Sequence, residues 1–211
     1  MHQSQNKEYF NEIVRRVKED YLVWVEQFLD IIEANIDSQN ANTLNDIGCN
    51  VGQFWKGLKR RNLNIQYRGY DIEPIYIQTA KSIFPEINNF LYLINITKEK
   101  PKHTDISVTS AILEHLESLS PGLDNILETT DKLIILRTFM SESNEKFEFI
   151  KENEKILYCI NQYSFIKVLS LFEKYGFKTN VIRDRYTDSL PKYLGQDILR
   201  TQYIIVGKKN E

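Results

Sequence analysis

Apolar residues recur along the chain with two different periods, and these periods predict alternating strands and helices. Short runs rich in β-branched and aromatic residues predict strands near residues 43–47, 66–70, 90–95, 105–110, 132–138, 177–183 and 201–208. Apolar positions at steps of three and four residues predict helices near residues 52–61, 73–83, 120–129 and 162–175. We therefore expect an α/β fold, with a single doubly wound and mostly parallel sheet of seven strands and helices on both faces.

The first part of the chain predicts a helix that precedes this alternation. Residues 7–35 carry apolar side chains at steps of three and four, which places them on one stripe of a long amphipathic helix. The structural interpretation is packing on the sheet. The functional one is that its first turns also cap the active site, and the two are compatible. We divide the chain into this N-terminal helix (residues 1–40), packing on or capping the core, and an α/β domain (residues 41–211).

Two stretches have no place in the alternation, residues 141–161 and residues 184–200. Each follows a predicted strand at the edge where an open α/β sheet binds its ligands, outside the carboxyl ends of the strands. Insertions at this edge often shape substrate recognition, and loops that only pack are the alternative. Tyr158 in the first stretch and Tyr186 in the second are therefore candidate substrate-binding residues.

Composition and charge limit the classes of function. A chain of 211 residues fits one α/β domain with a buried core. Its formal charge of −2 gives no overall attraction to nucleic acid, and no apolar run approaches the ~20 residues that span a bilayer. Cys49 and Cys159 form no C-x-x-C motif, and the polar N-terminus does not resemble a signal peptide. We expect a cytoplasmic protein with free thiols and with neither membrane nor nucleic acid as a partner; the sequence does not indicate its oligomeric state.

The most informative chemistry lies in the run Leu44-Asn45-Asp46-Ile47-Gly48-Cys49-Asn50-Val51-Gly52. A short strand ends on an acid, the backbone turns on glycines, and a helix begins. Glycine is needed where the backbone takes a positive φ angle or where a ligand lies against it. About twenty residues on, a second strand ends at Asp71, whose carboxylate is able to accept hydrogen bonds from both hydroxyls of a ribose. This arrangement is typical of a βαβ unit that holds a nucleoside.

The spacing of the glycines indicates which nucleoside cofactor fits. Nicotinamide and flavin sites use G-x-G-x-x-G, whereas this loop reads acid-x-Gly-x-x-x-Gly, which disfavours a nicotinamide-dependent oxidoreductase. With a second acid at the next strand end, the pattern resembles the class I S-adenosylmethionine (SAM) methyltransferases. The resemblance extends over roughly residues 43–207 and includes residues 105–116 with their Leu-Glu-His-Leu ending, residues 132–137 and the turn at 175–178. Asn50 stands where the family usually has glycine, and asparagine tolerates a left-handed backbone better than most residues.

The resemblance implies SAM as the cofactor and assigns roles to the loop and the neighbouring strand ends. Asp46 and the backbone at Gly48 face the amino-acid end of SAM. Asp71 binds the ribose and Ile72 packs beside the adenine, while Asn95 stands where the family usually has an aspartate that accepts from the adenine amine. The cofactor-binding residues implied in this way are Asp46, Gly48, Cys49, Asn50, Gly52, Asp71, Ile72, Asn95 and Ser110.

Glu114 and His115 are the titratable pair near the end of the fourth strand, where the resemblance places Ser110 beneath the reacting methyl. The histidine is able to take a proton from a hydroxyl acceptor near neutral pH, which makes the pair candidate catalytic residues. The alternative is that Glu114-His115 is a structural signature of the family, fixing the loop and helix that follow. A similar acid–histidine segment is linked to a metal in the quinone-pathway O-methyltransferases, but a single pair does not indicate a metal site, and we predict none.

Arg137, at the end of the fifth strand, is the remaining candidate for substrate binding. In one interpretation it binds an anionic group of the substrate. In the other it caps the carboxyl end of a helix.

We therefore expect a SAM-dependent methyltransferase that acts on a small molecule, more readily at oxygen than at nitrogen, with a sugar or glycan precursor as one candidate. The Asp/Asn-Pro-Pro-Tyr/Phe sequence, with which the resembling DNA and protein-glutamine methyltransferases grip a planar amino nitrogen, does not occur. The alternatives are a methyltransferase of a protein or RNA partner and a non-catalytic SAM-binding protein that acts as a partner subunit.

Overall fold

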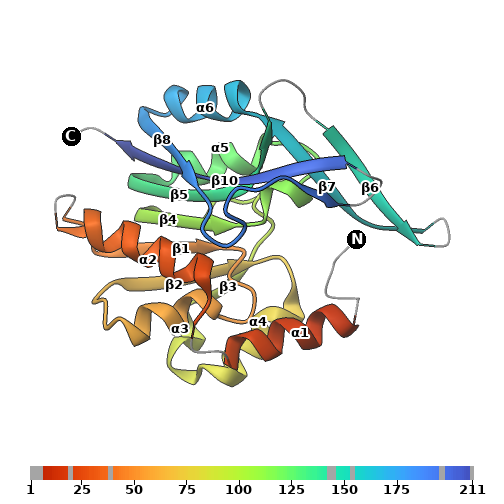
Figure 1. Ribbon diagram of the computed structural model, residues 1–211. Helices are drawn as coiled ribbons and strands as arrows, with labels where there is room; N and C mark the ends of the chain where they lie inside the picture. The colour runs from red at the N-terminus through yellow and green to blue at the C-terminus, as the bar shows by residue number, and fades with distance from the viewer. Residues whose placement is uncertain are drawn as a thin grey trace.

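One central sheet organises the molecule, and its main strands lie where the sequence predicts them (Figure 1). The computed structural model describes residues 7–18, 21–37, 40–141, 146–152, 155–194 and 198–209. Five parallel strands lie side by side in the order β3 (Leu91–Leu93), β2 (Gln66–Asp71), β1 (Thr43–Ile47), β4 (Thr104–Ser110) and β5 (Thr130–Ser141). The sheet continues with two antiparallel neighbours, β10 (Ile198–Lys209) and then β8 (Phe177–Arg183).

The predicted α/β fold class is confirmed, but within the described residues the sheet has ten strands rather than seven. The additional strands come from the two stretches that had no place in the alternation, and they are β6 (Lys146–Glu152), β7 (Lys155–Ser164) and β9 (Lys192–Leu194). β7 pairs with β5 only where Met140 and Ser141 meet Tyr163 and Ser164, and its other neighbour is β6. A strand with so short a junction to the main sheet does not need the continuous apolar pattern of a central strand, so the periodicity did not reveal it.

Helices cover both faces of the sheet, as predicted (Figure 1). On one face lie α2 (Val23–Ile36), α3 (Gln53–Arg60) and α4 (Pro74–Ile83); on the other lie α5 (Gly122–Glu128) and α6 (Phe165–Lys174). Alternate residues of β5 divide between the two faces, with Leu133 and Ile135 in one buried cluster and Ile134 and Leu136 in the other. Two 3-10 helices, η2 (Pro85–Phe90) and the single turn η3 (Leu113–His115), precede β3 and follow β4, respectively. No helix in the described ranges is long and apolar enough to cross a bilayer.

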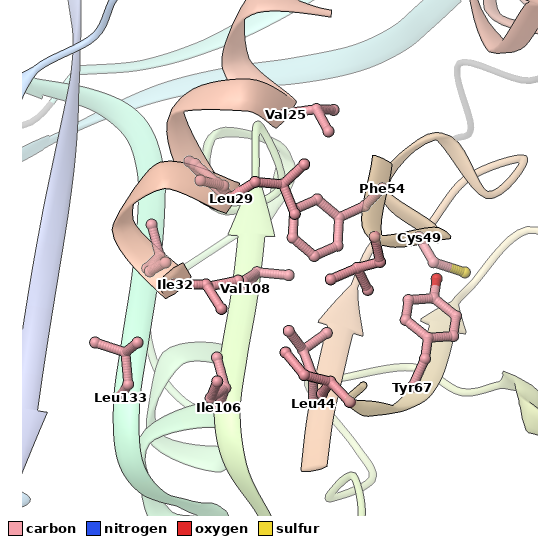
Figure 2. Close-up of a cluster of buried hydrophobic side chains, with 14 of the residues drawn as sticks. Val25, Leu29, Ile32, Leu44, Cys49, Phe54, Tyr67, Ile106, Val108 and Leu133 are labelled. Carbon is pink, nitrogen blue, oxygen red and sulfur yellow. The ribbon is translucent and has the colours of Figure 1, made fainter. Parts of the chain in front are cut away.

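The prediction of one long helix over residues 7–35 is wrong, because the segment forms α1 (Lys7–Lys18) and α2, with Leu22 extended between them (φ −117°, ψ 115°). The two helices bury their stripes against different partners. α2 packs Val25, Leu29 and Ile32 into the cluster over the sheet (Figure 2), whereas α1 packs on the loop after β1 and on α4. An apolar stripe keeps its period through such a break, so the sequence pattern does not reveal it.

Gly207 lets α6 approach β10 near the carboxyl end of that strand. A Cβ atom at this position would lie 2.7 Å from the Phe172 ring and 2.8 Å from Ile134 Cγ2, which is closer than packed carbon atoms approach. We predict that Gly207→Ala lowers the free energy of unfolding by about 1–3 kcal/mol through overpacking. Urea unfolding followed by circular dichroism measures this change. An unchanged midpoint would show that α6 does not lie so close to the strand.

Candidate active site

A cleft of about 1450 Å³ opens at the carboxyl ends of the parallel strands. Most of the predicted site residues line it, namely Asp46, Gly48, Cys49, Asn50, Asp71, Ile72, Asn95, Ser110, His115, Arg137 and Tyr186. Gly52 and Glu114 are not among its lining residues. Tyr158 belongs to β7, and its side chain lies outside the described part of the structure.

The loop after β1 has the left-handed turns that its sequence predicts. Gly48, Asn50 and Gly52 have positive φ angles of 77°, 52° and 87°, so asparagine does adopt the conformation for which the resembling family uses glycine. The backbone amides of Gly48 and Cys49 both donate to the Tyr70 carbonyl, at 2.7 and 2.9 Å, and fasten the loop to the end of β2. Gly52 itself precedes the first turn of α3, which explains why it supports the loop without facing the cleft.

Asp71 joins this loop to the next strand end. Its carboxylate accepts from the Asn50 amide and from the Glu73 amide, each at 2.9 Å. The side chain is buried, and burial raises the pKa of Asp71 to about 6 against the opposing effect of these two hydrogen bonds. Each carboxylate oxygen has a second lone pair. The acid is therefore held rigidly at the cleft with capacity for further donors.

Asp46 is a second buried acid on the same side of the cleft. Tyr67 of β2 donates its hydroxyl to this carboxylate at 2.8 Å. Burial raises the pKa of Asp46 to about 7, and the Tyr67 hydrogen bond opposes that rise. Cys49, whose side chain lies near the Tyr67 ring (Figure 2), is also buried, and burial raises the pKa of its thiol. Because burial raises its pKa, the Asp46 carboxylate binds a proton readily, and it would also favour a cation bound beside it.

Asn95 and Ile72 lie at the β3 side of the cleft. The side-chain oxygen of Asn95 already accepts two hydrogen bonds from Thr97, from its amide at 3.0 Å and from its hydroxyl at 2.7 Å. The predicted contact with an adenine amine would therefore compete with this turn. Ile72 is 43% exposed and presents an apolar surface in the cleft.

His115 is oriented by β7. Its Nδ1 atom lies 2.8 Å from the Cys159 carbonyl oxygen, and the Cys159 thiol donates back to the His115 carbonyl at 3.0 Å. Because a carbonyl only accepts, the neutral ring carries its proton on Nδ1 and its lone pair on Nε2. Tyr163 of β7 also donates to the carbonyls of Leu113 and Leu116, at 3.1 and 3.2 Å, and so fixes the turn on both sides of the histidine.

Glu114, in contrast, points into the interior. Its side chain is buried, and its carboxylate accepts from the Thr138 hydroxyl of β5 at 2.9 Å. This geometry suits the structural alternative for Glu114, which ties the η3 turn to β5. The two neighbours thus have different environments, one facing the cleft and one facing the core.

Arg137 is neutralised by a partner that sequence reasoning did not identify. Its guanidinium donates to both carboxylate oxygens of Asp184, at 3.0 and 3.1 Å, and both side chains are buried. Although burial alone would raise the pKa of Asp184, Arg137 lowers it below its usual range. Arg137 also donates to Ser110 and Gln202, and its guanidinium lies 5.5 Å from the centre of the Tyr186 ring. It is therefore a paired cation in the wall of the cleft.

Several lining residues were missed because they come from segments without a motif. They include Tyr9, Glu12, Arg15 and Arg16 of α1, Trp24 of α2, and Glu73, Lys98 and Glu117. α1 is held near the cleft by Gln53, which donates to the Ile13 carbonyl at 3.4 Å, and by Lys56, which donates to the Lys18 carbonyl at 3.0 Å. Within this set, Glu73 lies close in the sequence to a predicted site residue, two positions after Asp71. The α1 residues reach the cleft only through tertiary packing.

Solved protein structures share this fold at low sequence identity. The N-terminal domain of EvdMO1, solved in the presence of S-adenosylhomocysteine (SAH) and D-fucose, is 13% identical with a TM-score of 0.68, over 100% of this chain and 98% of that one. The sugar N-methyltransferase KedS8 from a Streptoalloteichus species is 10% identical with a TM-score of 0.65, over 96% and 93%. Magnesium protoporphyrin IX methyltransferase from Synechocystis, with bound SAH, is 13% identical with a TM-score of 0.60, over 99% and 100%.

The sequence matches no family model and no curated protein. The structural likeness therefore rests on the arrangement of the chain, and it shows that this protein has the class I methyltransferase fold, as the sequence predicts.

The raised pKa of Asp46 predicts a gain in stability when its charge is removed. Because the folded protein binds this proton more tightly than the unfolded chain does, the ionised group destabilises the fold progressively as pH rises from ~4 to ~7. Asn in its place carries no charge and still accepts from Tyr67. We predict that Asp46→Asn raises the free energy of unfolding at pH ~8 by on the order of 2–4 kcal/mol, with the difference shrinking toward pH ~4. Urea unfolding at both pH values measures this, and equal stability of the two proteins at pH ~8 would contradict it.

Proposed function

We propose that this chain is a SAM-dependent methyltransferase with a small-molecule acceptor. The observation that carries the proposal is the junction between the loop after β1 and Asp71. The Asn50 amide donates to the Asp71 carboxylate and so holds the loop against the end of β2. Gly48 of this loop and Asp71, an acid suited to ribose hydroxyls, therefore line the same cleft. The likeness in fold to methyltransferases supports the same reading.

The residues around this junction fit SAM. Bound SAM supplies an electrophilic methyl group on a sulfonium centre. Asp46 suits the ammonium of its amino-acid end, because a cation beside this buried carboxylate would offset the cost of its charge. Asp71 has lone pairs left for the ribose hydroxyls, and the exposed side chain of Ile72 offers an apolar surface to the adenine.

Asp71 provides the sharpest test of cofactor binding. Hydrogen bonds to a charged group contribute roughly 1.5–3 kcal/mol each, so we predict that Asp71→Asn weakens SAM by at least about tenfold. Asp131→Asn, at the opposite end of the sheet strands, is the matched control and should leave the affinity unchanged. Calorimetry with SAM, SAH and NAD measures these affinities. Tight binding of NAD without binding of SAM would overturn the proposal.

We propose His115 as the general base for a hydroxyl acceptor. With SAM bound, the methyl group would pass from the sulfonium sulfur to the acceptor oxygen and leave SAH, and the Nε2 lone pair of His115 would accept the hydroxyl proton. The hydrogen bond from Nδ1 to the Cys159 carbonyl orients the ring and stabilises the positive charge that forms on it. Glu114 contributes by holding the η3 turn against β5 rather than by touching the acceptor.

The charge of the cleft favours a neutral acceptor. Asp184 balances the charge of Arg137, so this wall of the cleft offers hydrogen bonds and an aromatic surface rather than an excess cation. A sugar hydroxyl has that chemistry. The likeness to a protein solved with D-fucose and to a sugar N-methyltransferase supports a sugar or glycan precursor as the substrate. Together with Arg137, Tyr186 and Tyr158, which lies in β7, form the set of residues we propose to bind the acceptor.

A second candidate is methylation of an amino sugar at nitrogen, which the likeness to KedS8 favours. The two are separated by incubating the protein with SAM and a panel of free and nucleotide-linked sugars, with and without amino groups. Mass spectrometry of the products identifies the methylated atom. The proposal fails if SAM binds but no panel of hydroxyl or amino compounds yields SAH above the rate without acceptor.

His115→Asn separates a base from a structural residue. The asparagine amide is able to keep the hydrogen bond to the Cys159 carbonyl, but it has no lone pair at the position of Nε2 that accepts a proton. We predict an unchanged melting temperature, unchanged SAM affinity and a turnover lowered by roughly 10²–10⁴.

His115→Ala, which loses both functions, should lower the melting temperature as well as the turnover. If His115 is only structural, His115→Asn stays active, and turnover of His115→Ala falls only in proportion to the folded protein.

A further inference from the structure

The turn after β8 carries the partners of Arg137 and is organised around one side chain. We call residues 184–190 the β8–β9 loop. The Asp184 carboxylate accepts from the Thr187 amide at 3.0 Å and from the Thr187 hydroxyl at 2.6 Å, besides its bonds to Arg137. The Ser189 hydroxyl accepts from the Asp184 amide and donates to the Gln202 carbonyl, each at 2.8 Å. These bonds hold the inner side of the loop against β5 and β10.

The outer side of the same loop is held by Gln27 of α2. The Gln27 side chain is only 4% exposed, in a helix whose neighbouring buried residues are mostly apolar. Its Nε2 donates to the Arg183 carbonyl at 2.7 Å, and its Oε1 accepts from the Arg185 amide at 2.8 Å. One amide thus pairs with the backbone on both sides of Asp184, much as an adjoining strand would. A buried amide that satisfies both of its groups in this way has a defined position.

A second contact lies one helical turn further along the same face of α2. Asp30 forms an ion pair with Arg185, and the hydrogen bond from Arg185 lowers the pKa of Asp30. Asp30 also pairs with Arg61 at 2.9 Å, which ties this face of α2 to the end of α3. The ion pairs are partly exposed and contribute little by themselves. The buried Gln27 amide is therefore the principal connection between α2 and the loop.

This connection joins two parts of the cleft wall. Val23 and Trp24, in the first turn of α2, line the cleft, and so does Tyr186 in the β8–β9 loop. Most residues assigned to the cofactor lie at the ends of β1 and β2, with Asn95 after β3 and Ser110 at the end of β4. Arg137 comes from β5, on the far side of β4. Because the loop packs on Arg137 and not on the ends of β1 and β2, its position affects the acceptor side of the cleft.

We propose that Gln27 is a positioning residue for the acceptor: it fixes the β8–β9 loop so that Tyr186 and Arg137 form one wall of the acceptor pocket. This inference rests on the proposed function, in that it assigns the wall to the acceptor rather than to SAM. Gln27 does not touch the acceptor itself. Its effect passes through the backbone of residues 183–185.

Gln27→Met is the principal variant, because methionine has nearly the same length and removes both hydrogen bonds. Hydrogen–deuterium exchange of the peptide covering residues 183–190 should become faster by roughly tenfold, as two lost hydrogen bonds allow. Calorimetry with SAH should give an affinity within about twofold of that of the unaltered protein. For the panel sugar with the fastest methyl transfer, KM should rise by roughly fivefold or more while kcat changes less.

Two further variants make the result specific. Glu33→Gln removes an ion pair of α2 with Arg61, away from the loop, and should leave exchange and KM unchanged. Gln27→Glu keeps an acceptor for the Arg185 amide but places a buried carboxylate oxygen against the Arg183 carbonyl oxygen, so it should speed exchange of residues 183–190 at least as much as Gln27→Met.

The possible results are distinct. Unchanged exchange at residues 183–190 in Gln27→Met would show that Gln27 does not fix the β8–β9 loop. Faster exchange with unchanged KM would overturn the role of Gln27 in acceptor binding. An equal loss of SAH affinity and acceptor binding would also overturn the inference, because it would indicate a general loss of structure. If the unaltered protein binds neither SAH nor SAM, the proposed function fails, and the assignment of the wall to an acceptor fails with it. The exchange experiment still shows whether Gln27 fixes the β8–β9 loop.

Discussion

The parallel pairing of β2, β1, β4 and β5 brings the carboxyl ends of these strands to one edge of the sheet. The register places Ile47 opposite Tyr70 and Thr109, and Ser110 opposite Arg137. Residues that lie far apart in the sequence therefore reach the same cleft. The glycine loop, Asp71 and His115 lie at this edge because they are at or just after the ends of parallel strands.

The cleft treats its buried charges in two different ways. On the side proposed for the acceptor, Arg137 and Asp184 neutralise each other through two hydrogen bonds, so the burial of both is compensated. On the side proposed for the cofactor, Asp46 accepts from a phenol and Asp71 from backbone amides, and burial raises the pKa of both. A cationic ligand would relieve that cost on the cofactor side, whereas a neutral one suits the other. The two halves of the cleft therefore differ in their electrostatic environment.

The two N-terminal helices connect these halves to the rest of the fold. α1 packs Ile13 and Val17 on Val51 of the glycine loop and on Tyr76 of α4, close to the cofactor side. α2 is part of the sheet's own core (Figure 2) and holds the β8–β9 loop through Gln27. The single apolar stripe in the sequence therefore packs against two different partners, the sheet in α2 and the glycine loop with α4 in α1. Its break at Leu22 lets each helix follow its own partner.

The sequence by itself determined the local chemistry, because backbone conformation and strand ends depend on nearby residues. It predicted seven strands at their observed places, the left-handed turns at Gly48, Asn50 and Gly52, and the approach of Asp46 and Asp71 to one cleft. It did not predict the division into α1 and α2, the strands β6, β7 and β9, or the partners of Arg137 and His115. Asp184 and Cys159 lie 47 and 44 positions from the residues they bind, and Gln27 lies 158 positions from Arg185. Only the tertiary structure decides such contacts, since no local pattern specifies which distant backbone a buried polar group will meet.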